Sequence, residues 1–166
     1  MTTLTSPQVL GATIPFLIGY HPIDSLVVVS IKDDCVGMAM RVDYPIDLPA
    51  SAYDLLASHL QREDSTGALL VAYVPSDKND GEVVLSDSAA ALKRIDVAID
   101  ESLLIKDGRY RSMLCADSQC CPPAGREVPE ISASRIALEH VVAGRTMPFA
   151  NIEALTESIS PLIISE

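Results

Sequence analysis

The chain has 166 residues, 48% of them hydrophobic and 21% charged, with a formal net charge of −11 at pH 7. This length and composition predict one folded domain, and they exclude a disordered chain, a fibre and a small disulfide-rich scaffold. The excess of acidic residues disfavours binding of nucleic acid through a basic face and contact with an anionic membrane.

The sequence contains no stretch that approaches the roughly 18 apolar residues of a membrane span. The apolar run from Val9 to Tyr20 is not preceded by a basic stretch, so it predicts a buried helix rather than a signal peptide. Its four cysteines come without other signs of secretion. We therefore expect a cytoplasmic protein with reduced thiols.

Helices and strands are expected to alternate in the first half of the chain. Pro7 suits a first helical turn, and the residue before Pro22 avoids helical geometry, so the first helix should end near Leu17. A run of β-branched residues predicts a buried strand, and Asp33-Asp34 predicts a turn into its hairpin partner. In chain order we expect a helix over 7–17, strands over 25–32 and 35–44, a helix over 50–62 and a strand over 67–74.

The second half predicts a second hairpin, an irregular segment and two terminal helices. Asp107-Gly108 is a hairpin turn signal, and the segment from Asp117 to Pro129, which contains three prolines and a glycine, is expected to be irregular. The expected elements are a helix over 84–95, strands over 97–106 and 109–115, a helix from Ser132 or Ser134 to about 143, and a helix over 151–159.

This order of elements, α-β-β-α-β-α-β-β-α-α, predicts an α/β sandwich with a mixed five-stranded sheet. Two parallel crossovers lie in the middle, with an antiparallel hairpin on each side, and helices pack on the sheet. The single domain then consists of a sheet-and-helix core over about 1–116, a Cys/Pro loop over 117–130 and C-terminal helices over 131–166.

Several short segments are distinctive in combination. They are PFLIGYHP at 15–22, DSLV at 24–27, RVD at 41–43, the DGR turn at 107–109, and Cys115 followed by CCPP at 120–123 and Gly125. In this order, the segments resemble domain-of-unknown-function family 4192, which occurs in actinobacteria and their phages. Members are often longer, with a helical C-terminal part. This chain stops where that part would begin, which would suit a phage-encoded or otherwise minimal version. The resemblance implies a fold and motif positions but no reaction.

The first candidate site is the segment between the first helix and the first strand. His21 could act as a general base, with Asp24 orienting it and Ser25 as the nucleophile. No nucleophile-elbow motif is present, however, and the favoured alternative is a structural corner. In that interpretation His21 bonds a backbone carbonyl and Asp24 forms an Asx turn.

The second candidate site is on the strand over 35–44. Alternation places Val36, Met38, Met40 and Val42 on the core face, and it places Cys35, Gly37, Ala39, Arg41 and Asp43 on the other. The small residues allow a close approach, so Arg41 could hold the anionic group of a ligand. The favoured alternative is an ion pair between Arg41 and Asp43, or with neighbouring strands, that covers a sheet end.

Arg109 and Arg111 form the third candidate site, since they share one face of a predicted strand. Together with Arg41 they could form a positive pocket for an anionic small molecule or a carboxylate-bearing partner. The favoured alternative is a pair of edge-strand arginines that prevents edge-to-edge pairing.

The fourth candidate is the cluster of Cys115, Cys120 and Cys121. Zinc is a minor alternative, because the spacing is not C-x2-C and His21 or His140 would have to complete the site. A disulfide from Cys115 to Cys120 or Cys121 is a second alternative. We favour small buried thiols that fix a proline turn, and we expect no other cofactor.

These features leave two hypotheses about function, because no P-loop, dinucleotide-binding, zincin or paired-carboxylate motif is present. The first is a cytoplasmic accessory or regulatory module that binds a protein partner or a second copy of itself. An apolar C-terminal end supports it, made of Ile159, Leu162, Ile163 and Ile164. The second is an enzyme or small-molecule sensor, with a pocket at the carboxyl ends of the parallel strands lined by His21, Asp24, Arg41 and Asp43.

Overall fold

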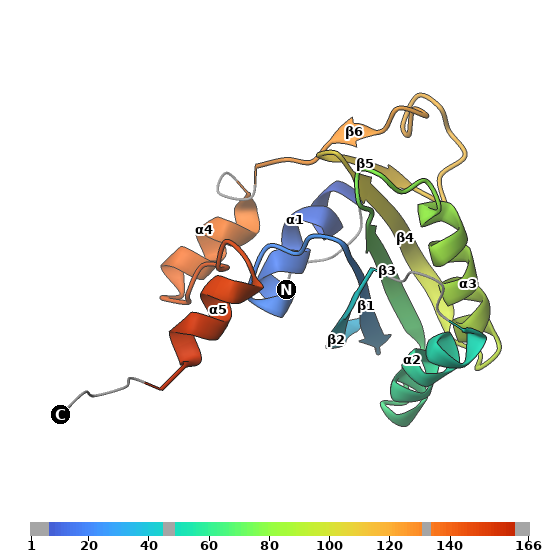
Figure 1. Ribbon diagram of the computed structural model, residues 1–166, viewed down its shortest axis with the longest axis horizontal. Helices are drawn as coiled ribbons and strands as arrows, with labels where there is room; N and C mark the ends of the chain where they lie inside the picture. Colours follow the sequence, from blue (N-terminus) through green and yellow to red (C-terminus); the bar gives the residue numbers. More distant parts are fainter. Residues whose placement is uncertain (1–6, 45–48, 131–133, 162–166) are drawn as a thin grey trace.

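A mixed six-stranded sheet forms the centre of the molecule in the computed structural model, which describes residues 7–44, 49–130 and 134–161 (Figure 1). The helices are α1 (Pro7–Ile18), α2 (Ala50–Arg62), α3 (Gly81–Lys93), α4 (Arg135–Val142) and α5 (Ile152–Ile159). The strands are β1 (Ser25–Lys32), β2 (Cys35–Asp43), β3 (Gly67–Tyr73), β4 (Ala98–Lys106), β5 (Arg109–Ser112) and β6 (Arg126–Glu127). The expected α/β fold with a mixed sheet is confirmed, with one more strand than predicted.

The strands lie in the order β2-β1-β3-β4-β5-β6. β1 runs antiparallel to both β2 and β3, β3 runs parallel to β4, and β5 and β6 continue the sheet in antiparallel fashion. β2 and β3 therefore point the same way on either side of β1, so the chain makes the two expected crossovers, through α2 and through α3. Because both crossovers advance in the same direction across the sheet, a common handedness places their helices on one face.

Helices α2 and α3 cover that face of the sheet (Figure 1). The main buried contributors are Leu26, Val28, Leu70 and Ala72 from the sheet, Tyr53, Ala57 and Leu60 from α2, and Val84, Leu85 and Leu92 from α3. Alternate residues of the same strands point to the other face. There Val27, Val29, Leu69, Val71 and Leu103 pack against Leu10 and Ile14 of α1. The near-continuous apolar runs of β1 and β3 follow from this double coverage.

Helices α4 and α5 lie beside α1, away from the sheet (Figure 1). The ring of Phe16 in α1 packs against that of His140 in α4, with centroids 4.5 Å apart. Tyr20 and Phe149 form an isolated β-bridge that ties the end of α1 to the segment before α5. Within the described ranges, no helix has the length and the apolar content needed to cross a membrane.

β2 differs from the expectation at its outer half. Met40 and Val42 pack on the core as predicted, but Val36 is exposed and Met38 is only half-buried. The strand lies at the edge of the sheet, and a bulge between Val29 and Ile31 interrupts its register. The core face of β2 is therefore limited to its second half.

Gly37 accommodates a close neighbour, as its small size suggested. A Cβ atom there would lie 2.6 Å from the hydroxyl of Ser30 across the bulge. That hydroxyl accepts a hydrogen bond of 2.7 Å from the amide of Met38. The close approach in β2 thus involves the neighbouring strand and not a ligand.

Two element boundaries differ from the prediction by three residues. α3 begins at Gly81 rather than Val84, and β5 ends at Ser112 rather than Cys115. The Ser112 hydroxyl donates to Glu101 Oε1 at 2.6 Å and accepts from the amide of Leu114 at 3.3 Å. The amide of Met113 still donates to the carbonyl of Ser102 at 2.7 Å, so these side-chain bonds accompany the last backbone contact between the two chain segments.

Candidate functional site

The segment from Tyr20 to Ser25 forms a corner between α1 and β1. The amide of His21 donates to the carbonyl of Phe149 at 3.0 Å, and the amide of Phe149 donates to the carbonyl of Gly19 at 2.9 Å. Asp24 adopts a left-handed backbone (φ 43°), and its carbonyl accepts from the amide of Tyr44 at 2.8 Å. The corner therefore joins the start of β1, the end of β2 and the segment that precedes α5.

Arg41 links the two strands of the first hairpin at the same end. Ser25 pairs with Asp43 in the β1–β2 register, which brings both beside Arg41. Arg41 donates from Nε to Ser25 Oγ at 2.7 Å and from Nη1 to Asp43 Oδ1 at 2.7 Å. The Arg41 side chain is 21% exposed, whereas that of Asp43 is 91% exposed. The expected Arg41–Asp43 ion pair is present, and it leaves Nη2 without a partner in the described ranges.

The Ser25 hydroxyl occupies a structural position. Ser25 is fully buried, and its Oγ donates to the carbonyl of Ile23 at 2.5 Å while accepting from Arg41. A hydroxyl held in this way is poorly placed to attack a substrate. The geometry favours the structural-corner interpretation for Ser25. That interpretation also expected His21 to bond a backbone carbonyl, but the His21 side chain has no hydrogen-bond partner among the described residues.

Four of the candidate residues line one pocket of about 790 Å³. The pocket lies where β1 begins and β2 and β3 end, and β2 and β3 point the same way on either side of the antiparallel β1. Its lining comprises Tyr20, His21, Ile23, Asp24, Arg41, Asp43, Tyr44, Pro75, Asp77, Lys78, Asn151, Ile152 and Glu153. The structure thus brings His21, Asp24, Arg41 and Asp43 together, as the second hypothesis requires.

Two parts of this lining were not predicted. One is the loop after β3, which contributes Asp77 and Lys78. The other is the start of α5, where the Asn151 side chain caps the helix by accepting from the amide of Ala154 at 2.8 Å. The sequence signalled this cap, but no local pattern placed α5 beside the corner at His21.

The pocket is acidic on balance. Four carboxylates line it, from Asp24, Asp43, Asp77 and Glu153, against the cations of Arg41 and Lys78. At the pocket wall, the hydroxyl of Tyr44 donates to Asp80 Oδ1 at 2.7 Å. Burial and the neighbouring Asp80 raise the pKa of Tyr44 above its ordinary value, so this hydroxyl stays a donor at neutral pH.

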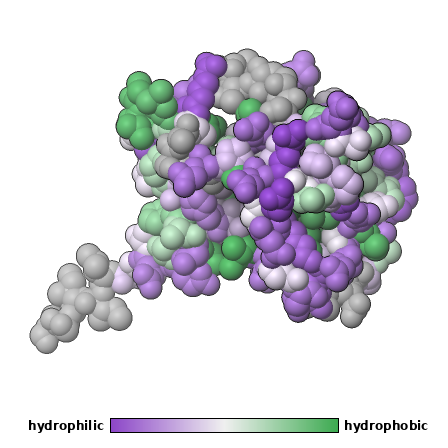
Figure 2. All heavy atoms as spheres, turned by 90° about the horizontal axis from the view of Figure 1, so that it is seen from above, coloured by the Kyte–Doolittle hydropathy of each residue, from purple (hydrophilic) through white to green (hydrophobic). Residues whose placement is uncertain are grey.

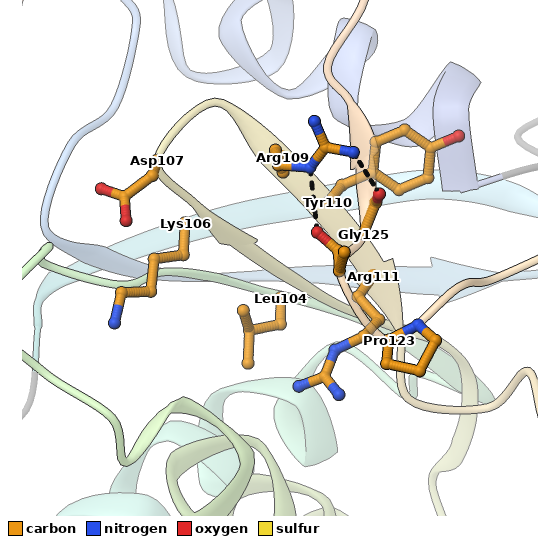
Figure 3. A pocket seen from close by; sticks show the side chains of 9 residues that line it. Leu104, Lys106, Asp107, Arg109, Tyr110, Arg111, Pro123 and Gly125 are labelled. Carbon is orange, nitrogen blue, oxygen red and sulfur yellow. Dashed lines mark hydrogen bonds between the residues drawn. The ribbon is translucent and has the colours of Figure 1, made fainter.

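Arg109 and Arg111 lie at a different place and do not join Arg41. They line a second, smaller pocket of about 250 Å³ together with Lys106 and Asp107 (Figure 3). Their guanidinium groups point apart in Figure 3, and the expected pocket of three arginines is therefore absent from the described residues. The edge-strand interpretation is also wrong, because β6 pairs with β5 and takes the edge position.

Both arginines already have partners. Arg109 donates from Nε to the carbonyl of Ala124 at 2.9 Å and from Nη2 to that of Gly125 at 2.7 Å (Figure 3). Arg111 forms an ion pair with Glu82 at the start of α3. Arg109 is thus hydrogen-bonded to the loop that follows β5, and Arg111 links α3 to the sheet through its ion pair.

The three cysteines of the loop after β5 gather at one point. Their sulfur atoms all lie within 4.8 Å of one another, and all three thiols are free. None of them is buried: Cys120 is exposed, and Cys115 and Cys121 are half-buried. The expectation of small buried thiols is therefore wrong, because most residues of this irregular loop are exposed at the surface.

The thiols influence each other's protonation. A hydrogen bond with Cys121 lowers the pKa of Cys115 below its ordinary value. The same bond, with desolvation, raises the pKa of Cys121 to about 11. Cys115 therefore ionises more readily than an isolated cysteine, and Cys121 less readily.

The fold and its sites define an α/β domain with a polar pocket at one end of the sheet and a cysteine cluster beside β5. The model of the family described as a domain of unknown function (DUF4192) matches residues 7–165, and the chain belongs to that family. No curated protein and no solved structure matches the chain significantly.

Proposed function

We propose that the protein is a small-molecule-binding domain whose site is the pocket between the His21 corner and the ends of β2 and β3. The observation that supports it is the convergence of His21, Asp24, Arg41 and Asp43 on one pocket of about 790 Å³. Binding sites for small molecules commonly measure about 300–1,000 Å³ and lie at the carboxyl ends of parallel strands. The pocket has this size, and it lies at the carboxyl end of β3, which pairs in parallel with β4.

The charges of the pocket favour a ligand that carries both signs. A purely anionic ligand would meet the carboxylates of Asp24 and Asp43, whereas a purely cationic one would leave Arg41 and Lys78 unused. A zwitterion can present an ammonium group to the carboxylates and an anionic group to Lys78 and to Arg41 Nη2. We therefore extend the proposal to small zwitterions of the amino-acid type.

Ligand binding is tested with three classes of probe: α-amino acids, dicarboxylates and diamines. A ligand at 100 times its Kd adds about 2.7 kcal/mol to the stability of the folded state, so binding raises the Tm. We expect amino acids to raise the Tm of the full chain and the other two classes to have little effect. If no class changes the Tm and calorimetry detects no heat, the proposal is wrong.

Two aspartates provide a matched pair of variants. Asp24→Asn removes a carboxylate from the pocket, and Asp33→Asn removes one from the turn at the other end of β1. Both residues have a left-handed backbone, which asparagine tolerates. We expect Asp24→Asn to weaken binding about tenfold or more, as the loss of a charged hydrogen bond does. An equal loss in Asp33→Asn would contradict the proposed site.

We propose self-association as a second function, supported by an exposed apolar stripe on α4. Leu138, Val141 and Val142 are 64%, 62% and 80% exposed and lie on one side of the helix. Hydrophobic residues are visible at the surface on the side of the molecule that α4 and α5 form (Figure 2). Because each copy carries the same stripe, a two-fold contact with a second copy would cover both stripes.

Light scattering of the purified chain tests this second proposal. We expect a dimer that becomes a monomer in Val141→Asp and stays a dimer in Val83→Asp, whose exposed valine lies on α3. Deletion of residues 160–166 is a second test. The apolar end of the sequence, at Leu162, Ile163 and Ile164, lies outside the described residues and is expected to pack on the domain or on a second copy. Its deletion should therefore change the stability or the oligomeric state. A wild-type monomer at all concentrations would contradict self-association.

A further inference from the structure

The sulfur atoms of Cys115, Cys120 and Cys121 are already close to the separation that one metal ion requires. All three lie within 4.8 Å of one another. At a Zn–S distance of about 2.3 Å, sulfurs bound to one tetrahedral zinc are about 3.8 Å apart. Small rotations of the side chains would therefore suffice to place three thiolates on one ion.

The backbone of the cysteine loop is held in place by hydrogen bonds. Arg126 donates from Nε to the carbonyl of Cys120 at 2.6 Å and from Nη2 to that of Gln119 at 2.8 Å. The amide of Cys121 donates to the carbonyl of Asp117 at 2.7 Å. Arg109 holds the far end of the loop through its bonds to Ala124 and Gly125. The convergence of the thiols thus belongs to a fixed loop, which lowers the cost of binding an ion.

The turn at Gly125 requires a glycine. Its φ is +75°, and a Cβ atom there would lie 2.9 Å from the carbonyl oxygen of Tyr110. The CCPP-x-G segment therefore folds back on β5, which brings Cys120 and Cys121 close to Cys115, three residues after the end of β5.

We propose that Cys115, Cys120 and Cys121 bind one Zn²⁺ ion through three thiolates, with the fourth coordination position open. Binding converts three thiols and Zn²⁺ into a complex of net charge −1 and releases three protons. No histidine or carboxylate joins the cluster among the described residues, so water or an external ligand fills the fourth position. The neighbouring guanidinium of Arg126 offsets the negative charge of the complex.

This proposal differs from the disulfide alternative in its stoichiometry. A disulfide between any two of these cysteines removes two hydrogens and leaves a single thiol, which cannot form a three-thiolate site. Zinc binding instead leaves the covalent mass unchanged and uses all three thiols. Cys35 is also a free, exposed cysteine, but it lies at the start of β2, on the opposite edge of the sheet. It therefore provides a matched control.

The test uses the full chain, reduced and stripped of metal, and titrates it with Zn²⁺ in competition with a chromophoric chelator. We expect one equivalent of Zn²⁺ to bind, with release of protons. Cys115→Ser, Cys120→Ser and Cys121→Ser should each weaken binding by more than about 100-fold, the upper end of what losing an outer-shell partner costs. Cys35→Ser should bind as the unmodified chain does. Titration with Cd²⁺ should produce a thiolate charge-transfer absorption in the unmodified chain and in Cys35→Ser, and a weaker one in the three loop variants.

Cys120 is exposed, so Cys120→Ser leaves the core intact and remains informative even if Cys115→Ser fails to fold. Circular dichroism establishes the folding of each variant. The proposal is overturned if the reduced chain binds no Zn²⁺, or if Cys35→Ser weakens binding as much as the loop variants do. It is also overturned if the intact mass of the gently purified chain is two hydrogens short, which would indicate a disulfide in the loop.

Discussion

The sheet with α1 to α3 and the pair α4–α5 are built in different ways. α1 and α3 each bury a run of side chains against the sheet, and β1 and β3 are almost entirely buried. α4 buries only Ala137 among its described residues, and α5 buries none. The C-terminal helices are held to α1 by a few contacts, among them the Phe16–His140 ring pair and the Tyr20–Phe149 bridge.

The weakly attached region nevertheless completes the pocket. Asn151, Ile152 and Glu153 form one wall, opposite residues that the rigid sheet positions. Segments with few buried contacts open at lower free energy than the core does. A pocket with one rigid wall and one loosely held wall can admit a ligand by local opening, without unfolding of the sheet. The comparison between the two regions therefore bears directly on the proposed function.

The largest difference is expected from equivalent truncations in the two regions. Leu70 is fully buried in β3, whereas Leu138 on α4 is 64% exposed. Leu70→Ala should lower the free energy of unfolding by about 2–5 kcal/mol, because it leaves a cavity in the core. Leu138→Ala should change it by less than about 0.5 kcal/mol. Urea denaturation of both variants measures the two values. Similar losses would contradict the difference between the buried sheet region and the weakly attached helices α4 and α5.

The polar groups within the sheet region allow a second, smaller test. The hydroxyl of Tyr73 is buried and has no hydrogen-bond partner among the described residues, and burial raises the pKa of Tyr73. Tyr73→Phe removes an unpaired polar group and should stabilise the fold by about 1 kcal/mol. Tyr44→Phe, which loses the bond to Asp80, should destabilise it by about 1 kcal/mol. Thermal unfolding should show a higher Tm for Tyr73→Phe and a lower Tm for Tyr44→Phe. Two shifts of the same sign would contradict the interpretation that one hydroxyl is unpaired and the other is hydrogen-bonded.

The attachment of the C-terminal helices predicts a local effect. Phe16→Leu keeps an apolar side chain in α1 but removes the ring contact with His140, which typically contributes about 0.5–1.5 kcal/mol. We expect faster hydrogen exchange in α4, with unchanged protection in β1 and β3. Mass spectrometry of deuterated peptides measures both. Equal loss of protection in the strands would mean that the two regions unfold together.

Much of the fold was predictable because local chemistry specified it. Among the described residues, every non-glycine with positive φ is an aspartate, including Asp33, Asp34 and Asp107 in the hairpin turns. Aspartate tolerates this backbone, so the turns were visible in the sequence. The helix caps at Ser134 and Asn151 were visible for a similar reason. β6 has only two residues, too few for a pattern, and depends on the loop that Arg109 holds.

The candidate site was predictable only in part. His21 and Asp24 precede β1, and Arg41 and Asp43 end β2, so the hairpin register alone brings them together. The remaining lining depends on contacts between distant segments, such as the bridge from Tyr20 to Phe149. The same limit explains the error about the arginines. Strand alternation places Arg109 and Arg111 on one face, but it cannot show which loops their guanidinium groups will bind.

The smallest expected effect concerns the end of the sheet remote from the pocket. The carboxylate of Asp100 lies over Gly67, where a Cβ atom would be 2.1 Å from Oδ2. Burial and, next, the carboxylate of Asp34 raise the pKa of Asp100 above its ordinary value of 3.8. The folded chain therefore holds this proton more tightly than the unfolded chain. The resulting stabilisation is complete below pH 3.8 and is lost as the pH rises through the raised pKa.

Asp100→Asn should accordingly be slightly more stable than the unmodified chain at pH 7 and equal to it at pH 3. Asp100 is exposed, so salt should reduce the part of the difference that comes from Asp34. Thermal unfolding across this pH range, at low and high salt, measures the effect. A variant that is less stable at pH 7 would mean that the ionised carboxylate stabilises the strand end. The sheet region would then have no electrostatic cost at this end.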